Sequence, residues 1–138
     1  MLPKQVEEHA YQAVMLGELE IDDTGRIWRV AARRWDRWTN ATRSIPCRRR
    51  RAEKRTGKYL QVRVMIDGVR SHALAHRIVW RHVHNRPIPT GLTVNHKDGD
   101  TTNNRPENLE LATYAEQTAH QIHVLGHDPT RNLVQFRG

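Results

Sequence analysis

Residues 92–117 read LTVNHKDGDTTNNRPENLELATYAEQ, and the order of residue types in this stretch decides the fold. A short apolar run ends at His96, a loop rich in Asp, Asn and Gly follows, and a second run begins at Asn108 and Leu109. Asp-Gly and Asn stabilise turns through positive φ angles and side-chain hydrogen bonds to the backbone. The stretch therefore predicts a strand, a loop and a second strand.

A helix is expected directly after the second strand. Thr113 can cap free backbone N–H groups and Glu116 can reach back to it, which makes a capping box. The helix is expected to run from about Tyr114 to Leu125, with Gly126 placed to end it. The end of the first strand and the first turns of this helix can then converge on one small site.

The pattern V-N-H-x-D-G-x-x-x-N-N-R-x-E-N-L, followed by A-T-x-x-E-[N/Q], resembles the signature of HNH endonucleases. It is most similar to the phage and intron-encoded, homing-type branch, and the resemblance extends over residues 60–123. It implies an α+β fold with a small ββα-metal (His-Me finger) core, in which a hairpin and a helix hold one divalent cation against a scissile phosphate.

The resemblance also implies roles for individual residues. His96 matches the general base, and Asn108 matches the Asn that holds the loop and helps to orient that base. The residue before the base is a metal ligand, commonly Asp or His, and here it is Asn95. The last signature position aligns with Gln117, and His120 lies on the same helical face, where it can complete or replace that ligand.

Phosphodiester hydrolysis needs an activated water, charge stabilisation on the phosphate and help for the departing oxygen. A neutral histidine suits the first task, and one divalent cation supplies the other two. Neutral amides at Asn95 and Gln117 predict weak metal affinity and favour Mg²⁺, with Mn²⁺ as the alternative, bound productively when DNA is present. Gln121 is a further candidate ligand on the helix.

Two other uses of nearby side chains stay open at this point. His120, His123 and His127 have the spacing i, i+3 and i+7, which allows a structural zinc site, although no cysteine accompanies them. Asp98 and Asp100 are expected to fix the loop by turn hydrogen bonds, and the alternative is that they bind metal.

The net charge of +8 is concentrated in the middle of the chain. Residues 26–86 carry 18 Lys and Arg against three acidic residues, whereas the segments on either side are net acidic. A basic segment rich in Arg suits phosphate contacts, so DNA is the predicted partner. The candidate DNA contacts are Arg33, Arg34, Arg48, Arg49, Arg50, Arg51, Arg63, Arg70, His76 and Arg77.

Residues 1–58 are expected to hold a helix over residues 5–16, a hairpin of residues 19–21 and 26–30, and an Arg-rich arm without regular structure over residues 31–58. The arm interleaves Arg with tryptophan. One interpretation is that it orders on DNA, because like charges at this density repel unless a polyanion neutralises them. The other is a solvated surface whose tryptophans fold into the core.

A second hairpin is predicted over residues 59–66 and 69–74, around the turn Asp67-Gly68. A helix over residues 75–83 follows, with one apolar face that consists of Ala75, Ile78, Val79 and Val83. This hairpin and helix resemble the sheet of AP2-type DNA-binding modules; the alternative is a hairpin that only completes the core. His76, at the helix start, is either a phosphate contact, a group behind the active site or a structural histidine.

These patterns predict an N-terminal DNA-contacting region (1–58), an HNH nuclease domain (59–126, with its ββα-metal core at 92–125) and a C-terminal tail (127–138). The predicted function is a metal-dependent DNA endonuclease, a monomer or homodimer that nicks or cuts duplex DNA. The alternative is a catalytically decayed DNA-binding protein. One cysteine excludes an internal disulfide, and no apolar run approaches the roughly 20 residues of a membrane span. The expected location is the cytoplasm, as a phage protein in a bacterial host.

Overall fold

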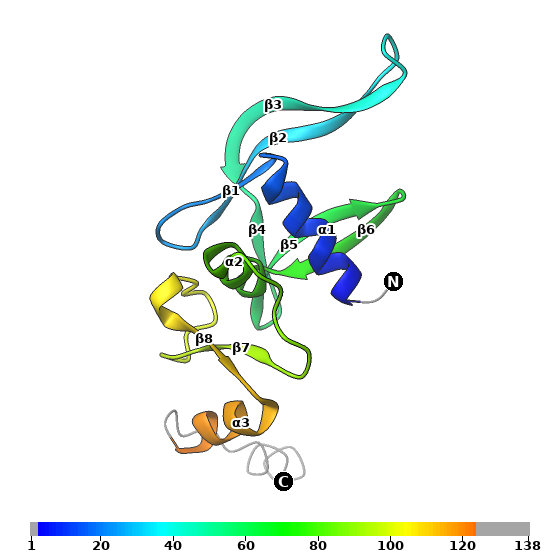
Figure 1. The fold of residues 1–138 in the computed structure, drawn as a ribbon. Coiled ribbons are helices and arrows are strands. Elements are labelled where there is room, and N and C mark those ends of the chain that lie inside the picture. The colour runs from blue at the N-terminus through cyan, green and yellow to red at the C-terminus, as the bar shows by residue number, and fades with distance from the viewer. Residues whose placement is uncertain (1–2, 124–138) are drawn as a thin grey trace, which may run out of the picture.

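The computed structural model describes residues 3–123, which fold into small antiparallel sheets with helices packed on them (Figure 1). Helix α1 (Pro3–Met15) is followed by Gly17 in a left-handed conformation, and strand β1 (Leu19–Ile21) pairs with β2 (Ile27–Asp36). These elements confirm the predicted N-terminal helix and hairpin. The helix begins two residues earlier than expected.

Strand β2 continues far beyond that hairpin and pairs with β3 (Ala41–Arg51), so that the two strands form a long ribbon. The ribbon projects from the body of the molecule (Figure 1). The prediction that residues 31–58 lack regular structure was therefore wrong. Cross-strand backbone hydrogen bonds form the ribbon without burying one face, and an unburied strand shows no apolar alternation in sequence.

The alternative that the tryptophans of the arm fold into the core is also wrong. Trp35 is 62% exposed near the end of β2, and Trp38 is 86% exposed in the turn between the strands. The ribbon is interrupted once, where Cys47, Arg48 and Arg49 lie opposite the single residue Val30. Such a bulge bends a ribbon and increases its twist.

The second sheet consists of β4 (Glu53–Thr56), β5 (Tyr59–Ile66) and β6 (Val69–Leu74). Asp67 and Gly68 both have positive φ angles, as a tight hairpin turn requires, and this confirms the predicted hairpin. Its resemblance to an AP2 module stays a prediction.

Helix α2 (Ala75–His84) follows β6 directly and ends at Asn85 in a left-handed conformation. Ala75, Ile78 and Val79 are buried as predicted, but Val83 is 47% exposed. Val83 lies in the last turn of α2, so the predicted apolar face is buried at its start and exposed at its end.

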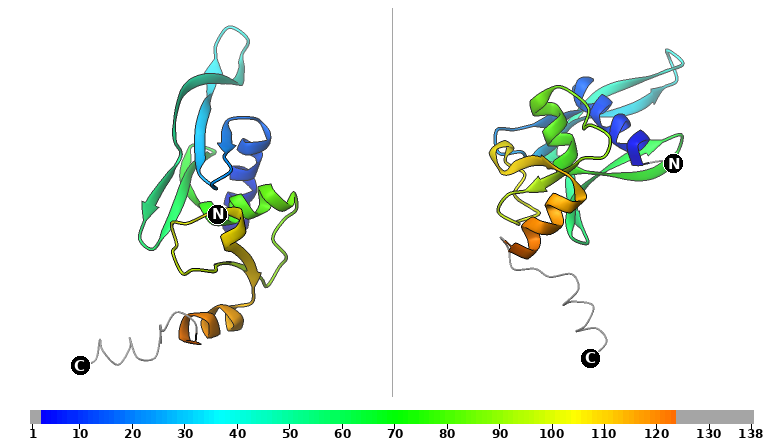
Figure 2. Two further views of the ribbon diagram at one scale, coloured as in Figure 1. Left: turned by 90° about the vertical axis from the view of Figure 1, so that its left-hand side faces the viewer. Right: turned by 60° about the horizontal axis from the view of Figure 1, so that its bottom comes forward.

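One apolar core connects these elements, and it crosses the boundary between residues 58 and 59. Helix α1 packs on β5, β6 and α2, and its buried residues Val6 and Ala10 join the same cluster as Val62 and Ile78. Figure 2 shows α1 and α2 beside the second sheet in two further views. The DNA-contacting region and the nuclease domain predicted from sequence therefore share a core.

The last sheet contains β7 (Thr93–His96) and β8 (Leu109–Ala112), with a single 3₁₀ turn (Pro106–Asn108) before β8 and helix α3 (Tyr114–His123) after it. This confirms the predicted order of strand, loop, strand and helix. The backbone N–H of Glu116 donates to Thr113 Oγ1 (3.1 Å), as a capping residue requires.

The sheet of β7 and β8 and helix α3 lie at the opposite end of the molecule from the ribbon (Figures 1 and 2). The predicted helix end at Leu125 and Gly126 and the tail over 127–138 lie outside the described residues. Within residues 3–123, no helix is both long enough and apolar enough to cross a membrane.

Candidate active site

His96 ends strand β7 with its side chain turned into the molecule. Side chains alternate between the two faces of a strand, so His96 shares its face with the core residue Val94, and Asn95 lies on the other face. His96 is only 4% exposed, and its Nε2 lies 2.8 Å from Oδ1 of Asn104. An Nε2–H that donates to this oxygen leaves Nδ1 unprotonated and free to accept a proton.

Aromatic rings hold the His96 imidazole from behind. The ring centroid of His76 lies 4.7 Å from that of His96, and the ring of Tyr59 stacks at 6.2 Å. Burial lowers the pKa of His96, although its hydrogen bond with Asn104 acts in the opposite direction. His96 is therefore held in the neutral form that a general base needs at neutral pH.

His76 does not reach the surface. It is 3% exposed, and burial, followed by the charges of His96 and Arg77, lowers its pKa to about 3. This burial does not support a contact between His76 and a DNA phosphate, and that assignment stays a prediction. The structure instead favours the second possibility, a group that packs behind the site.

Asn108 holds the loop between the two strands. Its Nδ2 donates to Asp98 Oδ1 and to the carbonyl oxygen of Asn103 (both 2.9 Å), and its Oδ1 accepts from the backbone N–H of Asp98 (3.1 Å). The side chain that bonds directly with His96 is that of Asn104. The sequence did not single out Asn104 for this role. The repeated Asn of the N-N-R motif was the available signal.

Asp98 and Asp100 are engaged within this loop. Asp98 Oδ1 accepts from the backbone N–H of Asp100, and Asp98 Oδ2 accepts from the amide of Asn103. Asp100 Oδ1 accepts from both the backbone and the hydroxyl of Thr102. These are the turn hydrogen bonds expected of the two residues, and they lower the pKa of both carboxyl groups.

The predicted metal ligands lie on β7 and α3. Asn95 is 6% exposed, and its Nδ2 donates to Oε1 of Glu110 (3.2 Å). Gln117 is half-buried in the first turns of α3. His120 places Nε2 2.9 Å from the carbonyl oxygen of Lys97, which leaves its Nδ1 as the nitrogen for a metal.

Within the described residues, no group of three His, Cys, Asp or Glu side chains is arranged to hold a metal ion. A cation at this site would therefore depend on amide oxygens as well. The side chains of Gln121 and His123, and all of His127, lie outside the described residues, so the zinc alternative stays a prediction.

A comparison with protein families matches this site. The sequence profile of a family described as HNH endonuclease covers residues 73–119, from β6 to the middle of α3. This segment matches the HNH endonuclease family, and it is called the HNH module below. It includes His96, Asn108 and Asn95. No curated protein matches the sequence.

The fold around the HNH module is also found in a solved structure. The chain is similar to the HNH homing endonuclease I-HmuI, described for its DNA binding and cleavage, with a TM-score of 0.52 and 17% sequence identity. The match covers 88% of this chain and 61% of the other, so the chain spans less than two thirds of that protein. At this identity the likeness concerns the fold.

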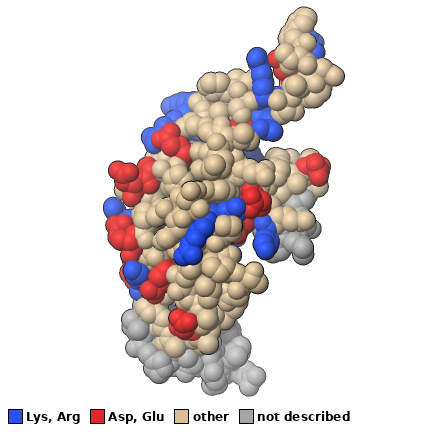
Figure 3. Space-filling view, viewed as in Figure 1, with Lys and Arg blue, Asp and Glu red and all other residues tan. Residues whose placement is uncertain are grey.

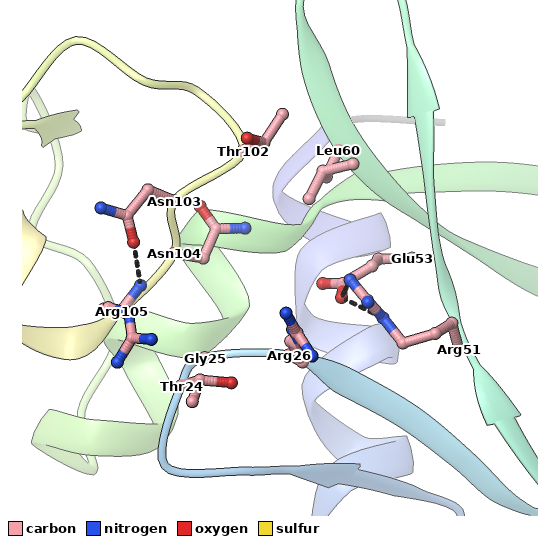
Figure 4. A pocket seen from close by; sticks show the side chains of 10 residues that line it. All are labelled: Thr24, Gly25, Arg26, Arg51, Glu53, Leu60, Thr102, Asn103, Asn104 and Arg105. Atoms are coloured by element: carbon pink, nitrogen blue, oxygen red, sulfur yellow. Dashed lines mark hydrogen bonds and ion pairs between the residues drawn. The ribbon is translucent and has the colours of Figure 1, made fainter.

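A cleft of about 300 Å³ adjoins the HNH module on the far side of Asn104 (Figure 4). Gly25, in the turn between β1 and β2, forms one wall, and a Cβ atom there would lie 1.8 Å from the carbonyl oxygen of Asn104. Arg26 and Arg105 line the same cleft, and among the described residues neither guanidinium has a bonding partner. Sequence reasoning missed this contact between the N-terminal hairpin and the loop that holds the base.

Most of the predicted DNA contacts outside the HNH module lie on or beside the ribbon. A second cleft of about 440 Å³ between the ribbon, α1 and β5 is lined by four of them, Arg33, Arg34, Arg50 and Arg63, and also by Arg29, which the sequence did not single out. Figure 3 shows Lys and Arg side chains along the ribbon. Arg48 and Arg70 are exposed and have no ion pair among residues 3–123.

Several of the predicted arginines already have acidic partners. Arg33 pairs with Glu18 (3.1 Å), Arg49 with Glu20 (3.6 Å) and Arg51 with the buried Glu53. Inside the HNH module, Arg77 pairs with Glu7 of α1 (2.5 Å) and its side chain is only 26% exposed. Arg77 thus joins two helices, and its assignment as a DNA contact stays a prediction.

Proposed function

We propose that the chain is a metal-dependent endonuclease that hydrolyses phosphodiester bonds of duplex DNA, with His96 as the general base. The observation that carries this proposal is the environment of His96. Burial lowers the pKa of the imidazole and so favours its neutral form, and in the tautomer that donates Nε2–H to Asn104 Oδ1 (2.8 Å) the lone pair is on Nδ1. A base of this kind accelerates proton transfer by about 10² to 10⁴. The HNH module supports the same chemistry.

Asn95, Gln117 and His120 are the residues proposed to hold the cation. Two amide oxygens and one imidazole nitrogen form a neutral donor set, which suits an oxygen-preferring ion such as Mg²⁺ or Mn²⁺ when substrate oxygens complete the shell. When bound, the cation supplies Lewis-acid stabilisation of the phosphate and of the leaving oxygen. The hydrogen bonds of Asn108 fix the conformation of the loop, and this keeps the side chain of Asn104 within hydrogen-bond distance of His96.

The proposed DNA surface consists of the ribbon and the cleft beside it. Arg29 and Arg50 lie directly opposite one another on neighbouring strands, and burial together with the charge of Arg50 lowers the pKa of Arg29. Like charges in opposed positions destabilise a sheet unless an anion lies between or beside them. The carboxylate of Glu18 offsets part of the repulsion at Arg29, and DNA phosphates would supply further negative charge. Arg34, Arg48, Arg63 and Arg70 extend the surface.

Arg26 and Arg105 are a second proposed contact, closer to the base. Their guanidinium groups line the cleft beside Asn104, where a phosphate next to the scissile one can bind (Figure 4). One module holds one cleavage centre, so a monomer is proposed to nick DNA, and cutting both strands requires a homodimer or two events. A phage protein acting in the cytoplasm of its host stays the proposed setting.

A catalytically decayed DNA-binding protein is the second candidate. It is favoured by the neutral side chains of Asn95 and Gln117, which bind a hard cation more weakly than carboxylates. The two candidates differ in one property: both bind DNA, but only the nuclease breaks its backbone.

The test is incubation of the purified protein with supercoiled plasmid in EDTA, Mg²⁺ or Mn²⁺. The expected result is relaxed or linear plasmid that requires metal and is lost in His96→Ala. His82→Ala is the matched control, because His82 is an exposed histidine on α2. Plasmid that is bound but stays intact with every metal, including plasmids that carry random inserts, would establish the decayed candidate instead.

A further inference from the structure

Glu110 lies directly opposite Asn95 in the sheet of β7 and β8. Opposed residues of an antiparallel pair project to the same face. The two side chains are joined by the bond from Asn95 Nδ2 to Glu110 Oε1 (3.2 Å), and Glu110 is half-buried. A carboxylate therefore lies next to the position at which the HNH module carries a neutral amide.

The other acidic residues of this region have different tasks. Asp98 and Asp100 are bonded within the loop, and Glu116 bonds with the capping hydroxyl of Thr113. Glu107 is exposed in the 3₁₀ turn. Only Glu110, among the acidic residues described between 92 and 117, bonds with a predicted metal ligand.

The amide of Asn95 is oriented by this contact. Its nitrogen is used to donate to Glu110, and within residues 3–123 its oxygen accepts no hydrogen bond. An amide oxygen and a carboxylate oxygen are both ligands of hard cations, and affinity rises with the number of charged ligands. Asn95 provides an amide oxygen and Glu110 provides a carboxylate oxygen. The backbone hydrogen bonds between β7 and β8 hold these two residues opposite one another.

We propose that Glu110 is a ligand of the divalent cation and supplies the negative charge that Asn95 lacks. This inference rests on the proposed metal-dependent function. In this arrangement the negative charge of the metal site comes from Glu110 on the second strand of the hairpin, directly opposite Asn95 on the first strand. The neutral residue at position 95 is then compatible with metal binding, because the pair as a whole carries one negative charge.

The test compares Glu110→Gln with Glu107→Gln. Each variant removes one negative charge from the same segment, but only Glu110→Gln changes the residue that bonds with Asn95. Gln retains an oxygen that accepts the hydrogen bond of Asn95, so Glu110→Gln removes the charge and keeps the contact. Equal unfolding temperatures of the variants in EDTA would show that the fold is intact.

Binding of Mn²⁺ is measured by electron paramagnetic resonance, first on the free full chain and then on its complex with a short DNA duplex. A His96→Ala background keeps the duplex uncut. Glu110→Gln is expected to raise the Kd for Mn²⁺ by at least about tenfold, as loss of a charged group at a metal site does. Glu107→Gln is expected to bind as the parent does.

A compensating variant sharpens the test. Asn95→Asp alone is expected to lower the Kd for Mn²⁺, and in Asn95→Asp/Glu110→Gln it is expected to restore much of the lost affinity. Equal Mn²⁺ affinity of Glu110→Gln, Glu107→Gln and the parent would overturn the role of Glu110. Failure of Asn95→Asp to restore affinity would show that the two positions do not share one cation, and it would also overturn the proposal.

These outcomes are separate from those of the plasmid assay. If cleavage requires metal and His96 but Glu110→Gln binds Mn²⁺ normally, the nuclease function stands and the role of Glu110 fails. If Glu110→Gln loses Mn²⁺ binding but the parent never cuts DNA, the metal site stands and the nuclease function fails. Absence of Mn²⁺ binding by the parent in both states would overturn the inference together with metal-dependent cleavage.

Discussion

Position 25 has no room for a side chain. A Cβ atom on Gly25 would lie 1.8 Å from the oxygen and 2.4 Å from the carbon of the Asn104 carbonyl group, and the φ angle of Gly25 is +77°. Because Asn104 bonds with His96, the N-terminal hairpin packs directly against the residue that contacts the proposed base. One glycine thus joins two segments that are distant in sequence.

Gly25→Ala is expected to be much more destabilising than Gly57→Ala. Gly57 has a similar φ of +67° but nothing within 4 Å of the added Cβ, so its replacement costs only the left-handed backbone, about 1–2 kcal/mol. Gly25→Ala adds a steric clash worth a further 1–3 kcal/mol or so. Denaturant unfolding measures both, and equal losses for the two variants would contradict the contact. Gly25→Ala is also expected to slow plasmid cleavage.

At the scale of an element, the ribbon of β2 and β3 combines high positive charge with little burial. Strand β3 has no buried residue, and Arg29 faces Arg50 across the strands. A two-stranded ribbon is marginally stable in water, and opposed arginines reduce its stability further. Neutralisation by a polyanion offsets this repulsion, so we expect the ribbon to be more stable on DNA than in the free protein.

The double replacement Arg48→Ala/Arg50→Ala is expected to weaken duplex binding and to flatten its salt dependence. Each lost phosphate contact removes about 0.9 from the slope of log K against log salt, so the slope is expected to fall by nearly two units. Fluorescence anisotropy without divalent metal measures this. Arg86→Ala, which removes one positive charge at a position beyond α2, is the control and is expected to leave the slope nearly unchanged. A double variant whose slope equals that of the parent would remove these residues from the DNA surface.

At the scale of the whole molecule, the buried histidine behind the site makes stability depend on pH. The pKa of His76 lies at about 3 in the folded protein, well below its ordinary value of 6.5. Between these two values the unfolded chain binds a proton that the folded chain does not. The contribution of His76 is therefore fully present above pH 6.5 and is lost progressively as the pH falls toward 3, at about 1.4 kcal/mol for each pH unit.

His76→Phe keeps a ring behind His96 and removes this titration. Between pH 7 and pH 5 the variant is expected to lose about 2 kcal/mol less free energy of unfolding than the parent does. Denaturant unfolding at the two pH values measures the difference. The control is His82→Phe, at an exposed position of α2, which is expected to follow the parent. Parallel losses for His76→Phe and the parent would show that the imidazole of His76 is protonated in the folded state.

Local patterns predicted what depends on neighbours in sequence. The capping box at Thr113, the turn at Asp67 and Gly68, and the strand that ends at His96 all follow from backbone preferences of a few adjacent residues, and all are present. The ribbon was missed because its stability comes from cross-strand pairing, and beyond Ala31 its side chains are mostly exposed, so they leave no apolar period in the sequence. A strand of this kind looks like a charged loop when it is considered alone.

By itself, the sequence determined the module: the order of strand, loop, strand and helix, the position of the candidate base, and the basic middle of the chain. Only the tertiary structure decided which side chains meet at the base. The bond from Asn104 to His96, the approach of Gly25 to Asn104 and the pairing of Glu110 with Asn95 depend on strand register and on packing between distant segments. Register and packing are set by the burial of a shared core, and no short stretch of sequence contains that information.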